Sequence, residues 1–216
     1  MQTVPEIVAS IVRASPYLED ALAAGIVNHS GLARRIRAEV EREAQKRVQP
    51  GAIIVAVGRL ARTVSGRGRP PRTVFRRAPD LIVRLNLFEA TYANSAELIR
   101  KQRELFSRSG QHPQSFLTIT RGINETTIIA SRELRARILD VCRGERLISQ
   151  IGHLGSVTVM LPEGTALIPG VYSFILKALA WEGLNVVEVV STLNEFTIIL
   201  EDKAIDAAFS IIKRLF

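Results

Sequence analysis

The run Pro169-Gly170-Val171 stands at the start of an apolar helical pattern and carries groups suited to anion binding. The N-terminus of a helix presents free N–H groups and the positive end of the helix dipole, and both favour a carboxylate. Gly170 has no side chain, so a ligand can approach the backbone closely. Asn185 both donates and accepts hydrogen bonds, so it can contact a polar ligand. The alternative is that Pro-Gly only starts the helix and Asn185 only caps a turn.

A second set of candidate functional groups is basic and lies in the first third of the chain. Residues 1–80 contain 14 Lys and Arg against 7 Asp and Glu, whereas residues 81–216 contain 15 against 14. Such an asymmetry indicates a polyanionic partner for the basic part, the alternative being a solvated basic face. The candidate nucleic-acid contacts are Arg34, Arg35, Arg37, Arg59, Arg62, Arg67, Arg69 and Arg72.

The sequence predicts neither an enzyme nor a metal protein. It contains no GxxxxGK phosphate loop and no motif that pairs a nucleophile with a base. The three histidines are scattered and Cys142 is the single cysteine, so we expect no zinc site, no other cofactor and no disulfide. No apolar run reaches the length of a membrane span, and the start is too short and polar for a signal peptide. We therefore expect a cytoplasmic protein that does not bind a membrane.

Apolar spacing predicts three helices in the basic part, over residues 15–26, 30–47 and 49–64, with Ser30 as a cap and Pro50 in a first turn. Three short helices with clustered arginines resemble a helix-turn-helix or winged-helix module, which implies contact with DNA. The third helix has almost no polar side chain for base edges. We expect it to be mainly core, with phosphate contacts made by the arginines.

Residues 63–79 contain the stretch SGRGRPPR and allow three interpretations. The run Arg67-Gly68-Arg69-Pro70 looks like the core of an AT-hook, in which arginines lie along a narrow minor groove. The same residues suit an extended linker. They also suit the wing of a winged helix, because β-branched residues stand on both sides of the basic tip.

The neutral part of the chain contains an internal repeat. NETTII and NEFTII, residues 124–129 and 194–199, both read as short strands that follow a turn. The surroundings of the first copy predict the order β-α-β-β-α-β over residues 80–152, and those of the second predict β-α-β-β-α over residues 153–216. This order is the ferredoxin-like split βαβ arrangement, with helices on one face of a small sheet.

Three motifs follow one another in the second copy: IPGV at residues 168–171, GLNV at 183–186 and STLNE at 191–195. With the tandem plan, they resemble ACT domains, the small-molecule-sensing modules of amino-acid metabolism, and above all the regulatory region of aspartokinases. The resemblance covers residues 80–216 and implies a small effector, an amino acid, bound between paired ACT units of a homodimer. The implied effector-binding residues are Ile168, Pro169, Gly170, Val171, Asn185, Val186, Ser191 and Thr192.

The expected fold is α+β, with a winged-helix-like domain over residues 1–79 and two ACT-like domains over residues 80–152 and 153–216. In the first copy, Ala93-Asn94-Ser95 replaces Pro-Gly-Val. The expected function is an amino-acid-responsive transcriptional regulator that binds double-stranded DNA. The alternative is a protein without a DNA role that modulates an enzyme of amino-acid metabolism, which the apolar third helix favours. We expect no enzymatic activity, because a kinase portion would not fit before residue 80.

Overall fold

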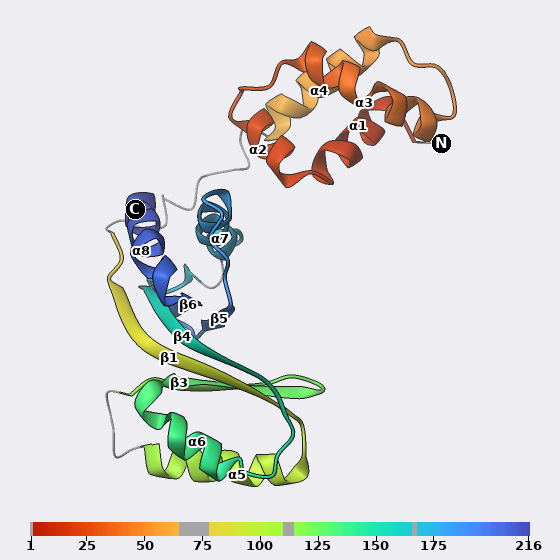
Figure 1. The fold of residues 1–216 in the computed structure, drawn as a ribbon. Helices are drawn as coiled ribbons and strands as arrows, with labels where there is room; N and C mark the ends of the chain where they lie inside the picture. Colours follow the sequence, from red (N-terminus) through yellow and green to blue (C-terminus); the bar gives the residue numbers. More distant parts are fainter. Residues whose placement is uncertain (1, 65–77, 110–114, 166–167) are drawn as a thin grey trace. The chain divides into compact units, whose positions relative to one another are not determined.

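The computed structural model describes residues 2–64, 78–109, 115–165 and 168–216. These residues fall into two compact units, an N-terminal unit that ends at residue 64 and a sheet unit that begins at residue 78 (Figure 1). Each unit has its own hydrophobic core. Most of the predicted wing or linker lies outside the described residues, including three of the candidate arginines: Arg67, Arg69 and Arg72.

The N-terminal unit contains four helices around one apolar core. They are α1 (Val4–Arg13), α2 (Pro16–Ala23), α3 (His29–Ala44) and α4 (Pro50–Val64). Helices α2 to α4 correspond to the three predicted helices, but the prediction lacks α1. The signals for α1 are local: the Glu6 carboxylate accepts from the backbone N–H of Thr3 at 2.7 Å, and an apolar stripe that includes Ile7 and Val12 is buried.

Helix α3 begins earlier than predicted. The side chain of Asn28 accepts from the N–H of Gly31 at 2.9 Å, so Asn28 rather than Ser30 caps the helix. At the other end, the Glu41 carboxylate accepts from the N–H of Val48 at 3.1 Å and from Nε of Arg37 at 3.0 Å. These bonds lower the pKa of Glu41 and tie α3 to the segment before α4.

Helix α4 is mainly a core helix, as its composition predicts. The residues that it buries are all apolar: Ile53, Ala56, Val57, Leu60, Ala61 and Val64. The exposed side of the helix keeps Arg59 and Arg62.

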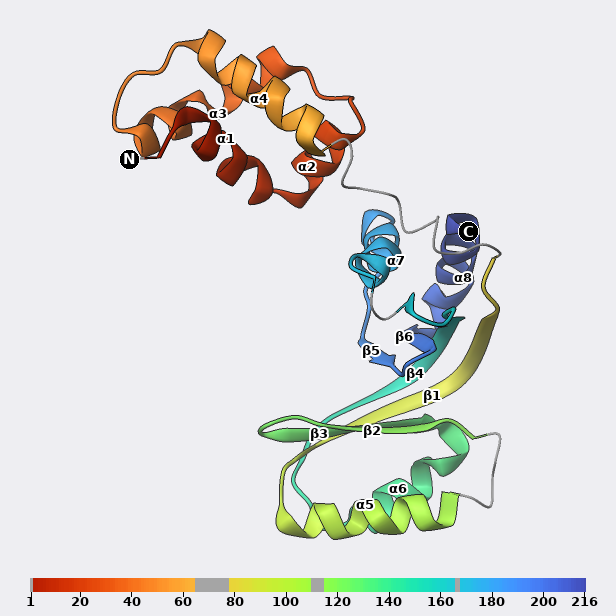
Figure 2. The ribbon, with the colours of Figure 1, turned by 180° about the vertical axis from the view of Figure 1, so that it is seen from behind.

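A six-stranded antiparallel sheet organises the sheet unit, in the order β2-β3-β1-β4-β6-β5 (Figure 2). The elements in chain order are β1 (Leu81–Ala93), α5 (Ala96–Ser109), β2 (Leu117–Arg121), β3 (Glu125–Ser131), the 3₁₀ helix η2 (Arg132–Leu134), α6 (Arg135–Val141), β4 (Leu147–Met160), α7 (Val171–Trp181), β5 (Glu188–Ser191), β6 (Glu195–Glu201), the 3₁₀ helix η4 (Asp202–Ala204) and α8 (Ile205–Leu215).

The long strands β1 and β4 run through both halves of this sheet. Strand β3 pairs with residues 87–93 of β1, and β6 pairs with residues 154–160 of β4. The predicted boundary between residues 152 and 153 therefore falls inside β4, and the two predicted ACT-like domains share one sheet. The backbone continues through Gly152 and His153, and the pairing of β4 with β1 shifts register nearby.

The repeat explains the rest of the topology. The two copies of the repeated hexapeptide lie in β3 and β6, and each strand is followed by a 3₁₀ turn and a helix. The second half lacks a sixth strand after α8, and residues 81–84 of β1 fill that place by pairing with residues 156–159 of β4. Each half thus has four strands and two helices in the ferredoxin-like arrangement.

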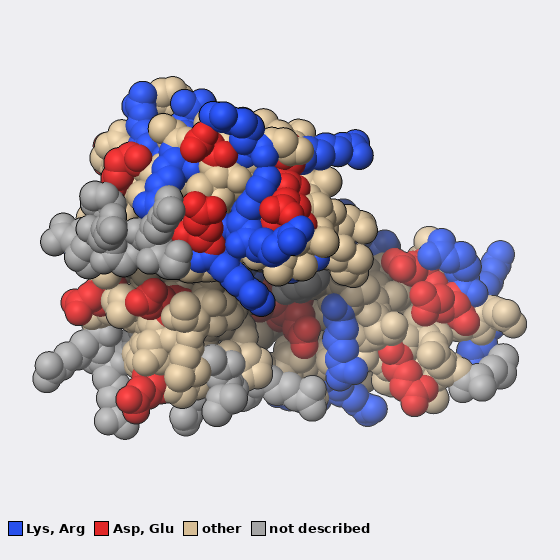
Figure 3. All heavy atoms as spheres, turned by 90° about the horizontal axis from the view of Figure 1, so that it is seen from below, with Lys and Arg blue, Asp and Glu red and all other residues tan. Residues whose placement is uncertain are grey.

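The helices cover the two halves separately (Figure 1). Helices α5 and α6 pack on residues of β1 and β3 that include Phe88 and Ile128, and α7 and α8 pack on residues of β4 and β6 that include Val157 and Ile198. The opposite face of the sheet has a smaller apolar cluster: Leu87, Ile129, Leu154 and Ile199. Over the face formed by α5 and α6, Lys and Arg side chains mix with Asp and Glu (Figure 3).

Candidate functional site

Helix α7 begins at a hollow of about 260 Å³. Its lining residues are Thr165, Ile168, Pro169, Gly170, Val171, Tyr172 and Ser173. Gly170 is the N-cap residue, and its φ of 90° lies in the left-handed region that disfavours a side chain. A Cβ at Gly170 would have only Ser173 Oγ within 4 Å, at 3.8 Å, so the space beside this backbone is open.

No side chain in the described parts of the protein caps the first turn of α7. Ser173 Oγ donates to the carbonyl oxygen of Gly170 at 2.9 Å, and the N–H of Phe174 donates to the same oxygen at 2.9 Å. The residues that line the hollow include no carboxylate. The helix therefore presents its positive end to a hollow that has no carboxylate among its described lining residues.

In the first half, side chains of the protein itself occupy the N-terminus of the corresponding helix, α5. Ser95 Oγ accepts from the N–H of Leu98 at 2.8 Å and donates to Glu145 Oε2 at 2.6 Å. Lys101 Nζ contacts the other oxygen of Glu145 at 2.8 Å. Hydrogen bonds from Lys101 and Ser95 lower the pKa of the Glu145 carboxyl, so this carboxylate is charged beside the start of α5.

The structure brings together four of the eight predicted effector-binding residues, Ile168 to Val171. The others do not line the hollow: Asn185 and Val186 lie between α7 and β5, while Ser191 ends β5 and Thr192 opens the turn to β6. Prediction also missed lining residues that flank the motif. Among them, Tyr172 stacks on Phe196 of β6 with ring centroids 4.4 Å apart, a contact that only the fold reveals.

The candidate nucleic-acid residues that the structure describes are exposed arginines of the N-terminal unit: Arg34, Arg35, Arg37, Arg59 and Arg62. Arg37 forms an ion pair with Glu41 on the same helix at 3.0 Å. No ion pair is present for the other four within the described residues. These four guanidinium groups are therefore available for contact with an anion such as a phosphate.

Within the described parts of the chain, no group of three or more His, Cys, Asp or Glu side chains is arranged to hold a metal ion. Cys142 is buried, and burial raises the pKa of its thiol. The helices described by the structure include none long and apolar enough to cross a membrane.

Glu89 is a buried carboxyl on the helix-free face of the sheet. Burial and the nearby Glu188 raise its pKa above the usual 4.5, against a weak bond from Thr91 Oγ1 at 3.4 Å. A carboxyl with a raised folded-state pKa contributes stability below its unfolded pKa and loses it as the pH rises through the folded-state pKa.

We predict that Glu89→Gln is more stable than the unsubstituted protein at pH 7 and that this gain shrinks towards pH 4. The amide removes the buried charge and keeps an acceptor for Thr91. Urea unfolding of both proteins at the two pH values measures the effect, with the exposed Glu125→Gln of β3 as control. A Gln variant that is equally or less stable at pH 7 would contradict the assignment.

Comparison with known proteins gives a fold but no close relative. No protein-family model matches the sequence, and no curated protein matches it. The solved structures that resemble it include an aspartate kinase and regulatory subunits of aspartate kinases. An aspartate kinase from Clostridium acetobutylicum has a TM-score of 0.54 at 14% identity, over 64% of this chain and 35% of that chain. The chain thus spans about a third of that kinase.

Regulatory subunits of aspartate kinases give the same result. The subunit from Thermus thermophilus has a TM-score of 0.52 at 14% identity, over 65% of this chain and 99% of that chain. The subunit from Thermus flavus has a TM-score of 0.51 at 13% identity over the same shares. The chain therefore contains the fold of aspartate kinase regulatory domains, as the sequence motifs predict. At these identities the likeness defines the fold alone.

Proposed function

We propose that the chain is a regulatory protein whose sheet unit binds an amino-acid effector at the start of α7. The observation that carries this proposal is the difference between the two equivalent helices. Glu145 and Ser95 occupy the start of α5, whereas the start of α7 has no side-chain cap and faces a hollow. A ligand carboxylate would take the place beside α7 that Glu145 takes beside α5.

The shape of the hollow supports a small ligand. Because Gly170 has no side chain, an effector carboxylate can approach the backbone N–H groups of the first turn. Tyr172 and Ile168 would contact the apolar part of such a ligand. The hollow is smaller than a typical pocket for a drug-sized molecule, which suits an amino acid.

We further propose that a second copy of the chain completes the site. The polar residues predicted to hold the effector, Asn185, Ser191 and Thr192, do not line the hollow of their own chain. Asn185 and Ser191 are exposed, and β5 is an edge strand with one side unpaired in the sheet. A homodimer would bring these groups of one chain to the hollow of the other.

The first test is a thermal-shift screen with the twenty amino acids. At a hundredfold its dissociation constant, a bound effector adds about 2.7 kcal/mol to the free energy of unfolding. We predict that one or a few amino acids raise the melting temperature of the full chain. If none raises it, the proposal loses its support.

A matched pair of glycine variants then assigns the effect to the hollow. Gly170 and Gly164 both have a left-handed φ, of 90° and 80°, but Gly164 is outside the hollow. We predict that Gly170→Ala weakens effector binding at least about tenfold, because the added methyl strains the cap and obstructs the backbone. Gly164→Ala should lose stability to a similar extent and keep its affinity. Equal affinities in the two variants would place the ligand elsewhere.

The exposed arginines of α3 and α4 favour a second candidate function, the binding of double-stranded DNA by the N-terminal unit. Phosphate contacts make binding strongly salt-dependent, and each lost contact lowers the slope of log K against log salt by about 1. We predict that Arg34→Ala with Arg35→Ala lowers this slope by about 2. Absent or salt-independent binding would favour the alternative, in which this unit binds a partner protein.

A further inference from the structure

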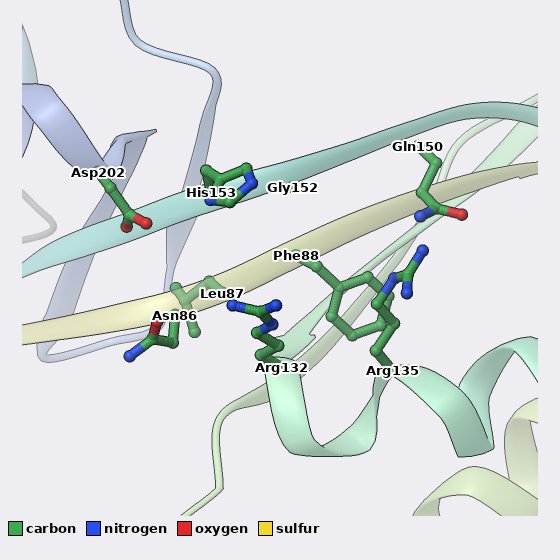
Figure 4. Close-up of a pocket in the computed structure, with 9 residues that line it drawn as sticks. All are labelled: Asn86, Leu87, Phe88, Arg132, Arg135, Gln150, Gly152, His153 and Asp202. Atoms are coloured by element: carbon green, nitrogen blue, oxygen red, sulfur yellow. The ribbon is translucent and has the colours of Figure 1, made fainter.

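A second hollow, of about 240 Å³, lies where the two halves of the sheet unit meet. Register shifts interrupt the pairing of β1 with β4 around Leu87 and Leu154. Beside these shifts, Asn86 and His153 have left-handed φ angles of 59° and 55°. Residues other than glycine rarely adopt such angles. We call this hollow the seam site; its polar lining residues are Asn86, Arg132, Arg135, Gln150, His153 and Asp202 (Figure 4).

The seam site contains two arginines that have no ion-pair partner among the described residues. Arg132 and Arg135 extend from η2 and α6 towards β1 and β4 (Figure 4). Within the described residues, neither guanidinium forms an ion pair with a carboxylate. With its side-chain oxygen facing Arg135, Gln150 accepts from Nε at 3.2 Å and from Nη2 at 2.7 Å, which fixes that arginine but does not neutralise it.

The carboxylate of Asp202 is the counterpart of these arginines. Its Oδ1 atom is buried and has no hydrogen-bond donor among the described residues. A buried carboxylate oxygen without a donor costs free energy, so a cation at the half-buried Asp202 carboxylate would stabilise this residue. Asp202 occupies in η4 the place that Arg132 occupies in η2, so equivalent positions of the two halves carry opposite charges.

We propose that the seam site binds an α-amino dicarboxylate, a molecule with two carboxylates and one ammonium group. The two arginines and Asp202 leave one net positive charge, which matches the single net negative charge of such a molecule. The carboxylates would pair with Arg132 and Arg135, and the ammonium would pair with the half-buried carboxylate of Asp202. The ligand would thereby link the two halves of the sheet. This site is separate from the hollow at α7 and does not depend on the function proposed for it.

Isothermal titration calorimetry of the full chain with L-aspartate and L-glutamate tests the proposal. We expect at least one of them to bind more tightly than succinate, which lacks the ammonium, and than L-alanine, which lacks the second carboxylate. Arg132→Gln and Arg135→Gln should each weaken binding about tenfold or more, since each removes a charge-assisted bond. Arg143→Gln is the matched control, because Arg143 is exposed, pairs with Asp140 and lies outside the site.

Two further variants separate this site from the hollow at α7. Asp202→Asn should remove the preference for aspartate or glutamate over succinate, and Gly170→Ala should leave binding at the seam site unchanged. The proposal is overturned if neither amino dicarboxylate binds, if succinate binds as tightly, or if the Arg132 and Arg143 variants have the same affinity. Binding lost in Gly170→Ala but kept in Arg132→Gln would assign the ligand to the hollow at α7 instead.

Discussion

Replacing Phe196 with alanine should lower the free energy of unfolding of the sheet unit by about 3–5 kcal/mol, the usual cost of truncating a buried phenylalanine. Phe196 is 1% exposed in the middle of the second-half core and stacks on Tyr172, with the ring planes 6° apart. Truncation leaves a cavity under the first turn of α7. Because Tyr172 also lines the hollow at α7, effector affinity should fall with stability.

Urea unfolding of the full chain measures the loss, and Phe106→Ala is the control. Phe106 lies on α5 with 54% of its surface exposed, so its truncation should cost far less. The two units can unfold separately, so the transition of the sheet unit is the one to follow. If the two variants lose equal stability, the second-half core is not packed as described.

The second large effect is expected at Gly155, where β4 passes close to α8. A Cβ at this position would lie 2.7 Å from Ile205 Cγ1 and 3.0 Å from the carbonyl oxygen of Arg84. The carbonyl belongs to β1, and pairing with β4 holds it in place, so only the isoleucine can move. We expect Gly155→Ala to lower the free energy of unfolding by about 1–3 kcal/mol, because the added methyl group overpacks the core.

Gly152 supplies the control for this prediction, because it lies on the same strand and a methyl group added there would have no atom within 4 Å. Gly152→Ala should be far less costly. In a double-mutant cycle, Ile205→Val should recover part of the loss at Gly155, because it removes the Cδ1 atom at 2.9 Å. A cycle with no coupling between the two positions would show that the strand and helix are farther apart.

Local patterns were sufficient for much of this fold. The hexapeptide repeat placed β3 and β6, and the apolar spacing after Pro169 placed α7. Residues 147–160 form one strand, whereas the predicted boundary between the two copies divides this strand after residue 152. The pairing of residues 81–84 with residues 156–159 of the second half could not be inferred either. Strands so far apart in the sequence leave no local pattern when they pair.

The hollow at α7 was also predictable only as far as it depends on local sequence. The IPGV motif identified the start of α7 because helix capping is a local property. The closure of α5 by Glu145 depends on a residue 50 positions away from Ser95, so the difference between the two halves emerged only from the fold. The seam site is the extreme case, since its arginines and Asp202 come from different copies of the repeat and meet only in the folded sheet.

The central claim is that the start of α7 is an open effector site while the start of α5 is closed. It is tested most directly by an ¹H–¹⁵N NMR titration of the labelled full chain with the amino acid that gives the largest thermal shift. We predict that the largest amide shifts occur at residues 170–173, with little change at the N–H of Leu98, which Ser95 already occupies. Shifts centred on α5, or no saturable shift at the start of α7, would contradict the claim.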